Sequence, residues 1–107
     1  MGTIDRSQLL AALERERALY RRRTPESSRL FGEARHLLGG VPMTWMNKWA
    51  GDHPIYFATA KGNRIIDVDG NEFIDFALGD TGAMAGHSPD ATVRAVRHRI
   101  EDAGGIT

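Results

Sequence analysis

The sequence predicts an α+β fold with N-terminal helices, a small antiparallel three-stranded meander and a C-terminal helix. Three observations support this prediction. Apolar residues repeat with helical period up to the pair Gly39-Gly40. From residue 55, short runs rich in β-branched and aromatic residues are separated by Gly-Asn and Asp-Gly pairs, which favour tight turns. A second helical stripe, at Val93, Val96 and Ile100, precedes Gly104-Gly105.

Two helices are expected before residue 40. The first covers residues 6–23, with Asp5 as its N-cap and Gln8 placed as in a capping box. Its apolar stripe is narrow, which favours a helix lying on a partner surface but leaves a frayed extension open. Thr24-Pro25 then predicts a second start, with threonine as the cap and proline at the first helical position. We expect this second helix to continue through its apolar stripe and to end at Gly39-Gly40.

Residues 41–54 show neither helical nor strand periodicity and are expected to form a loop. The loop holds two tryptophans and two methionines, among them Trp45 and Met46. Large apolar side chains are costly to expose, and loops of this length are usually functional or ordered by a partner. The loop is therefore a candidate binding segment.

The meander is expected to consist of strands at 55–60, 64–68 and 72–76, joined by turns at 61–63 and 69–71. Glycine in these turns supplies the positive φ that tight hairpins need. The side chains expected to be buried are those of Phe57, Ile66, Val68 and Phe73. A glycine-punctuated loop, 77–87, follows, and Ser88-Pro89 is expected to start the last helix as a cap and a proline.

Composition excludes several classes of protein. The 107 residues carry no formal net charge and no cysteine, so disulfides and thiol chemistry are excluded and no strong field favours nucleic acid. We expect no nucleic-acid partner, because Arg21-Arg22-Arg23 lacks interleaved aromatics and fits a solvated helix end. No apolar run is long enough for a membrane span, so no membrane partner is expected and the location is predicted to be cytoplasmic.

Several motifs favour structural roles over catalytic ones. The run from Asp67 to Asn71 resembles the start of a calcium loop, but its glycine is fourth instead of sixth and its twelfth residue is Leu78, so turn chemistry is favoured. Asp67, Asp69 and Asp75 are expected to face outward beside turns and strands. His87 is expected to be a structural histidine at a helix start, and the other histidines show no metal-ligand spacing.

The arrangement of several segments resembles the start of class III pyridoxal-phosphate (PLP) aminotransferases. The segments are Leu38-Gly39-Gly40-Val41, the run from Gly62 to Phe76, and Gly86-His87-Ser88-Pro89. Gly-Gly-Val favours the glutamate-1-semialdehyde aminomutase branch. The resemblance implies part of a PLP fold type I aminotransferase over residues 25–107, without the large PLP domain, and leaves residues 1–24 as a helical extension.

In that family a lysine holds PLP as a Schiff base. Only Lys48 and Lys61 occur here, and neither matches the family lysine. We therefore expect no catalytic residue, no cofactor-binding residue, no metal site and no PLP bound by this chain alone. The resemblance also implies a homodimer in the parent family.

The resemblance further implies a substrate pocket that recognises a small-molecule amine or amino acid. In the aminomutase branch, the positions of Met43, Met46 and Asp80 carry a serine, an arginine and a tryptophan, the first two engaging the substrate carboxylate. Methionine cannot neutralise a carboxylate and Asp80 would repel it, so a different substrate is expected. The substrate-binding residues expected here are Trp45, Met46, Asp80 and Thr81. A stand-alone interaction module and an inactive truncated product are the alternatives.

Overall fold

The computed structural model describes residues 5–42, 51–79 and 82–104. It confirms the α+β class: the described residues contain three α-helices and one three-stranded sheet. The chain forms two compact units. The first comprises Met1–Tyr56 with Asp67–Asn71, and the second comprises Phe57–Ile66 with Glu72–Thr107.

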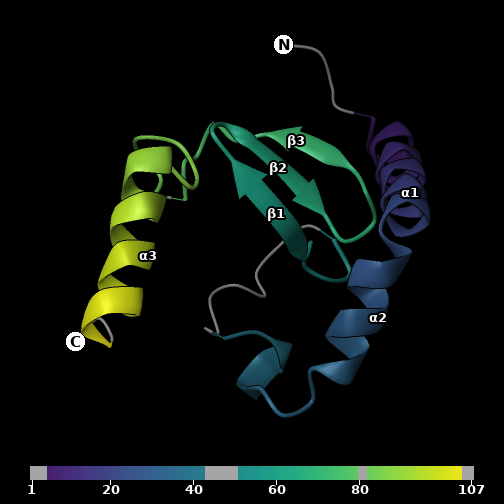
Figure 1. Cartoon of the computed structure of the whole chain (residues 1–107). Helices are drawn as coiled ribbons and strands as arrows, with labels where there is room; N and C mark the ends of the chain where they lie inside the picture. The colour runs from purple at the N-terminus through teal and green to yellow at the C-terminus, as the bar shows by residue number, and fades with distance from the viewer. Residues whose placement is uncertain (1–4, 43–50, 80–81, 105–107) are drawn as a thin grey trace. The chain divides into compact units, whose positions relative to one another are not determined.

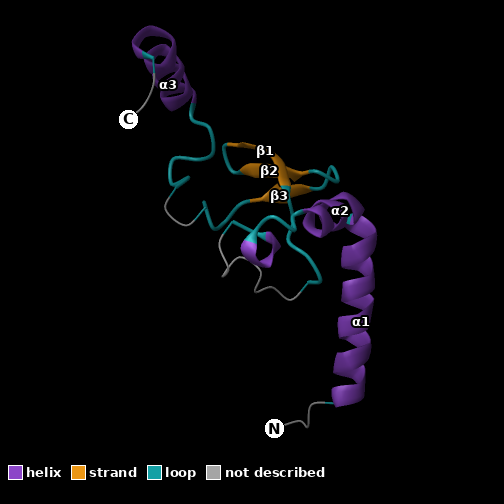
Figure 2. Cartoon of the chain, turned by 90° about the horizontal axis from the view of Figure 1, so that it is seen from below, coloured by secondary structure: helices purple, strands orange, loops and turns teal. Residues whose placement is uncertain are grey.

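Helix α1, Arg6–Arg23, in the first unit, has the predicted bounds. Asp5 is its N-cap, as predicted: its carboxylate oxygen Oδ1 accepts hydrogen bonds from the backbone N–H of Ser7 (2.9 Å) and of Gln8 (3.3 Å). Three arginines occupy its last turn, where cations complement the negative end of the helix dipole. Figure 1 shows α1 leading into α2, and Figure 2 shows α2 turning away from the axis of α1.

Helix α2, Pro25–Glu33, ends earlier than predicted. The prediction that it continues to Leu38 was wrong, because the chain leaves the helix at Ala34 (ψ 35°) and makes a 3₁₀ turn at Leu38–Gly40. Gly39 and Gly40 do adopt positive φ (77° and 74°), and a Cβ added at Gly40 would lie 2.6 Å from the ring of Phe31. The glycines therefore let the backbone fold back over Phe31, a tertiary contact that overrides helical periodicity.

The N-terminus of α2 is capped from a distant part of the chain. Thr24 occupies the N-cap position and Pro25 the first helical position, as predicted, but the hydroxyl of Thr24 donates to the carbonyl of Tyr20 (2.7 Å) and does not cap the helix. The cap is supplied by Asp69, whose carboxylate accepts from the backbone N–H of Glu26 (2.6 Å) and from the backbone N–H (3.0 Å) and hydroxyl (2.9 Å) of Ser27. The predicted outward orientation of Asp69 was therefore wrong, because free N–H groups at a helix start attract a carboxylate.

We expect Asp69→Ala to lower the free energy of unfolding by about 1–2 kcal/mol, because it removes the acceptor of two helix N–H groups. Burial opposes ionisation, but hydrogen bonds from Glu26 and Ser27 outweigh it and lower the pKa of Asp69. A carboxyl with a lowered folded-state pKa contributes stability above its unfolded pKa of about 3.9 and loses it as pH falls through the folded value. Urea unfolding at pH 7 and pH 3 measures both effects. Equal stability of the variant and the original chain at pH 7 would contradict the capping role.

The sheet has strands β1 Phe57–Lys61, β2 Arg64–Asp67 and β3 Glu72–Ile74 in the order β1-β2-β3. All of it belongs to the second unit except Asp67, the last residue of β2, which belongs to the first. Strands β2 and β3 are antiparallel, with Ile65 opposite Phe73. All three strands differ from their predicted bounds by a few residues at one or both ends. Gly62 and Gly70 adopt positive φ (58° and 82°), which confirms the two predicted turns.

Strand β2 has the opposite burial pattern to the one predicted. Ile65 and Asp67 are buried, whereas Ile66 is 40% exposed and Phe57 on β1 is 61% exposed. The predicted burial of Phe57 and Ile66 was therefore wrong, and Val68 and Phe73 are half-buried. Side chains alternate along a strand, so the inward orientation of Asp67 places Ile66 on the other face.

Helix α3, Asp90–Ala103, ends as predicted, with Gly104 in the left-handed conformation (φ 73°). Its start differs: Ser88 has φ 49°, and Pro89 is the N-cap residue, without a side-chain cap. The predicted inner stripe is uncovered, since Val93, Val96 and Ile100 are 41%, 38% and 51% exposed. In the parts of the chain that the structure describes, no helix combines the length and apolar character needed to cross a membrane.

Candidate functional site

The four predicted substrate-binding residues, Trp45, Met46, Asp80 and Thr81, lie outside the described residues. Each pair stands within a segment whose flanks are described. Loop residues 51–56 follow the first pair in the first unit, and a glycine-rich loop surrounds the second pair in the second unit. In each unit, hydrogen bonds among described polar groups hold the residues that flank the predicted pair.

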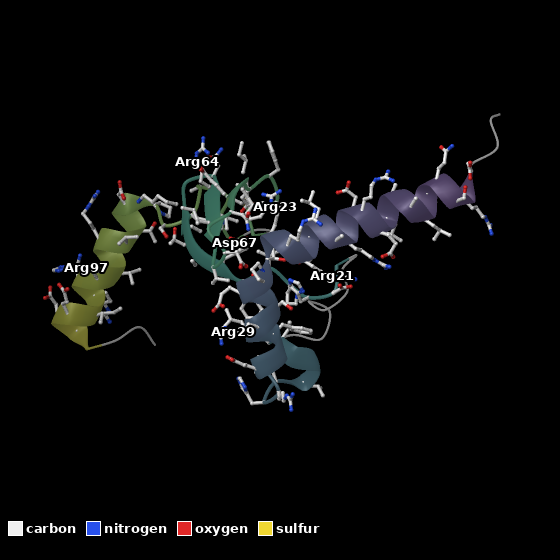
Figure 3. The ribbon with its side chains drawn as sticks, turned by 90° about the vertical axis from the view of Figure 1, so that its right-hand side faces the viewer. Arg21, Arg23, Arg29, Arg64, Asp67 and Arg97 are labelled. Atoms are coloured by element: carbon white, nitrogen blue, oxygen red, sulfur yellow. The ribbon has the colours of Figure 1, made fainter. Side chains whose placement is uncertain are left out.

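In the first unit, polar side chains gather where α1 passes into α2, and we call this group the junction cluster. Several of its members are almost fully buried: Thr24 (2% exposed), Ser27 (0%), His53 (3%) and Asp67 (1%). Figure 3 labels Asp67 and Arg23, which Asn71 connects: its side-chain amide donates to the carbonyl of Arg23 (2.8 Å) and to Oδ2 of Asp67 (2.8 Å). The cluster comprises Tyr20, Thr24, Ser27, His53, Asp67, Asp69 and Asn71.

His53 attaches the loop to the helix junction. Its ring nitrogen Nε2 lies 2.8 Å from the hydroxyl of Thr24 and 3.1 Å from the carbonyl of Thr24. Because the hydroxyl donates to Tyr20 and a carbonyl only accepts, Nε2–H is the donor to both oxygens. The phenol of Tyr20 donates to the carbonyl of His53 (2.5 Å), and burial raises the pKa of Tyr20. These contacts hold the loop backbone at His53, seven residues after Met46.

Asp67 organises the turn that supplies the α2 cap. Its Oδ1 accepts from the backbone N–H of Asp69 (3.0 Å) and of Asn71 (2.7 Å), and its Oδ2 accepts from the side-chain amide of Asn71 (2.8 Å). These bonds confirm that the Asp67–Asn71 motif forms a turn. Among the described residues, no group of three or more His, Cys, Asp or Glu could hold a metal ion. The predicted outward orientation of Asp67 was wrong, because its carboxylate satisfies N–H groups inside the turn.

In the second unit, Asp75 and His87 form a pair at the two ends of the glycine-rich loop. Asp75 Oδ2 and His87 Nε2 are 2.6 Å apart, with side chains 8% and 21% exposed. The hydrogen bond from His87, with backbone N–H groups of Leu78 and Ala77, lowers the pKa of Asp75. Asp75 therefore faces inward, contrary to prediction. Sequence reasoning gave His87 a structural role but missed its partner, although both residues stand in the motifs that carried the family resemblance.

Lys61 does not fit the role of a Schiff-base lysine. Its Nζ donates to the carbonyl of Ser88 (2.8 Å) and is paired with Asp90, and its side chain is 62% exposed. A Schiff-base lysine bonds through its amine to the aldehyde of the cofactor, whereas the amine of Lys61 is engaged with Ser88 and Asp90. Lys48 lies outside the described residues. Among the described residues, no lysine is therefore placed to hold PLP as a Schiff base.

Comparison with known proteins identifies an aminomutase and an aminotransferase among the relatives of this chain. The glutamate-1-semialdehyde 2,1-aminomutase of Thermodesulfovibrio yellowstonii is 39% identical over 82 residues, which cover 74% of this chain and 19% of that protein. The 3-aminobutyryl-CoA aminotransferase of Cloacimonas acidaminovorans is 40% identical over 81 residues, 73% of this chain and 20% of that protein. No protein-family model matches the chain.

A solved structure gives the same result. The crystal structure of a glutamate-1-semialdehyde aminomutase from Pseudomonas aeruginosa PAO1 superimposes with a TM-score of 0.83 and 35% identity, covering 92% of this chain and 22% of that one. A variant of the same enzyme has been solved in complex with PMP. The chain thus spans about a fifth of the length of the relatives it matches. It is a homologue of a segment of the class III PLP-dependent aminotransferases, the group that includes glutamate-1-semialdehyde aminomutase.

Proposed function

We propose that this chain is the part of a PLP-dependent transaminase or aminomutase that contributes substrate-pocket wall and dimer surface to a catalytic body. The observation that carries the proposal is the superposition on 22% of an aminomutase chain, at 35% identity and a TM-score of 0.83. In this proposal residues 25–107 are the segment with the aminotransferase fold and residues 1–24 are a helical extension. The superposition covers 92% of the chain and therefore also takes in much of that extension. PLP and its lysine belong to the catalytic body, and the cytoplasm is the proposed location.

Uncovered apolar side chains support the proposal. Isolated domains seldom leave large apolar side chains exposed at helical spacing, and such surfaces commonly mark contacts with other polypeptide. Helix α3 exposes the stripe that amphipathic helices normally bury. Helix α1 also exposes leucines, and the loops expose Leu38, Phe76 and Met84. A partner surface is therefore expected on each unit.

The proposed substrate is a small amine or amino acid that meets Trp45, Met46, Asp80 and Thr81. This choice depends on the methionine and aspartate that replace the carboxylate-binding arginine and the tryptophan of the aminomutase branch. An aspartate favours an amino group and disfavours a carboxylate. The proposed substrate contacts therefore differ from those of glutamate-1-semialdehyde aminomutase even though the fold is shared.

Association in trans tests the proposal. The Pseudomonas aeruginosa aminomutase, lacking the segment that this chain matches, is mixed with the 107-residue chain and examined by sedimentation velocity. We expect a complex, because the shared fold presents the same backbone to the body. The aminomutase's own segment, added in trans, is the control that the body retains its docking surface. If that segment binds while this chain sediments separately, the chain is an independent module or an inactive product.

A further inference from the structure

We propose that Asp75 and His87 are positioning residues that fix the two ends of the glycine-rich loop between them, and we call them the latch pair. The inference depends on the proposed function for its catalytic consequence only. By sequence, the proposed contact residues Asp80 and Thr81 stand between the two described halves of this loop. A latch at the ends of the loop would set how well those contacts meet a substrate.

Both latch residues are attached to the same turn of the sheet. The backbone of His87 makes two hydrogen bonds with Gly62, N–H to O at 2.7 Å and O to N–H at 2.9 Å. The backbone N–H of Asp75 donates to the carbonyl of Asn63 (2.8 Å). The turn between β1 and β2 therefore holds both ends of the loop, and the 2.6 Å side-chain contact joins them a second time.

The carboxylate of Asp75 also orders the first half of the loop. Its Oδ1 accepts from the backbone N–H groups of Ala77 and Leu78, both at 2.8 Å. Leu78 in turn accepts, through its carbonyl, the N–H of Ala83 (2.9 Å), and the side chain of Ala83 is buried. One carboxylate thus connects His87 with a backbone path that reaches the second half of the loop.

The backbone beside the latch pair is closely packed and partly strained. Gly86, with φ 84°, lies so close to the turn that an added Cβ would be 3.1 Å from the Cα of Gly62. Leu78 has φ 54°, a conformation that costs energy for a residue with a side chain. Such strain persists only where the surroundings impose it, and the hydrogen bonds of Asp75 to the Leu78 N–H and to His87 provide that constraint.

The same geometry favours a positioning role over a catalytic one. A general base must lie within reach of a substrate proton. The hydrogen bond to Asp75 engages only Nε2 of His87, but the side chains of His87 and Asp75 are 21% and 8% exposed, so the surrounding chain covers most of both. The pair therefore acts through the loop that it holds.

Amide hydrogen exchange on the 107-residue chain tests the latch directly. In His87→Ala, we expect the amides of Ala77 and Leu78 to exchange about tenfold faster, because Asp75 loses the partner that fixes its carboxylate. His87→Gln, whose side-chain amide can donate to Asp75, should restore most of the protection. Gly86→Ala should mimic His87→Ala without touching either polar group. The matched control is His98→Ala, which removes an exposed histidine 2.6 Å from Asp102 on α3.

Unchanged exchange at Ala77 and Leu78 in both His87→Ala and Gly86→Ala would overturn the inference. Failure of His87→Gln to restore protection would also overturn it, because the latch is a hydrogen bond. If His87→Ala loses its far-UV circular dichroism while His98→Ala keeps it, His87→Ala is unfolded. Amide exchange in Gly86→Ala and His87→Gln then tests the latch.

Steady-state kinetics separate a positioning role from a merely structural one. The chain is placed in the Pseudomonas aeruginosa aminomutase in exchange for its matching segment. We expect His87→Ala in this hybrid to raise KM for the amino substrate about tenfold while kcat stays within about twofold, because substrate contacts are lost in ground state and transition state alike. An unchanged KM overturns the inference. An inactive unmodified hybrid refutes the proposed function instead, and amide exchange then decides the latch alone.

Discussion

Replacing Asp67 with alanine is expected to lower the free energy of unfolding of the chain by about 2–4 kcal/mol. The carboxylate is 1% exposed and is the acceptor for two backbone N–H groups and the side-chain amide of Asn71. Alanine leaves the two backbone donors without this acceptor in a half-buried turn, whereas the amide of Asn71 keeps the carbonyl of Arg23 (2.8 Å). The same turn carries Asp69 to the start of α2, so the cap of α2 should loosen as well.

Urea unfolding followed by circular dichroism at 222 nm measures this loss. Asp67→Asn should show a smaller loss, because its amide oxygen can still accept from the backbone while its NH₂ group faces the amide of Asn71. The control is Asp102→Ala on α3, which removes a carboxylate that is 62% exposed and should change stability by less than about 0.5 kcal/mol. Equal losses for Asp67→Ala and Asp102→Ala would mean that the buried turn has no special energetic role.

Local signals predicted the elements whose ends are set by local chemistry. The start of α1 follows from Asp5 and the next three residues, and its end follows from the adjacent pair Thr24-Pro25. Gly62, Gly70 and Gly104 adopt positive φ where the sequence placed a turn or a helix end, because glycine alone does so without a steric penalty. For these elements no distant contact had to be known.

Elements governed by distant contacts were predicted less well. Helix α2 ends at Glu33 because the backbone folds back over Phe31, and its cap comes from Asp69, more than forty residues along the chain. Which face of β2 is buried depends on the inward orientation of Asp67. Hydropathy alone places an aspartate on the surface. Periodicity describes one element at a time and cannot report these interactions.

The candidate site was predicted through family resemblance more than through chemistry visible in the chain. The motif Gly86-His87-Ser88-Pro89 and the run that ends at Asp75-Phe76 indicated the family, and the comparisons confirmed it. The contact between Asp75 and His87 joins residues twelve positions apart through a sheet turn, so spacing alone could not reveal it. The roles of Trp45, Met46, Asp80 and Thr81 stay predictions.

The hybrid enzyme is expected to show the largest effect of all. Exchange of the matching segment of the Pseudomonas aeruginosa aminomutase for this chain should support amino-group transfer at least about 10³-fold faster than the enzyme with the segment deleted, because positioned contacts to the substrate supply a large part of the barrier reduction. The substrate preference of the hybrid should shift away from glutamate-1-semialdehyde. Met46→Arg should raise kcat/KM of the hybrid for that substrate about tenfold or more, because an arginine pairs with a carboxylate.

The rate of amino-group transfer by this hybrid, measured against the segment-deleted enzyme under identical PLP loading, is the most direct test of whether the chain completes an aminotransferase. The predicted result is turnover of an amine or amino acid well above the deleted enzyme, and loss of that turnover in Trp45→Ala with Asp80→Ala. A hybrid that folds and binds PLP but transfers amino groups no faster than the deleted enzyme, over a panel of amines and amino acids, would contradict the proposed function.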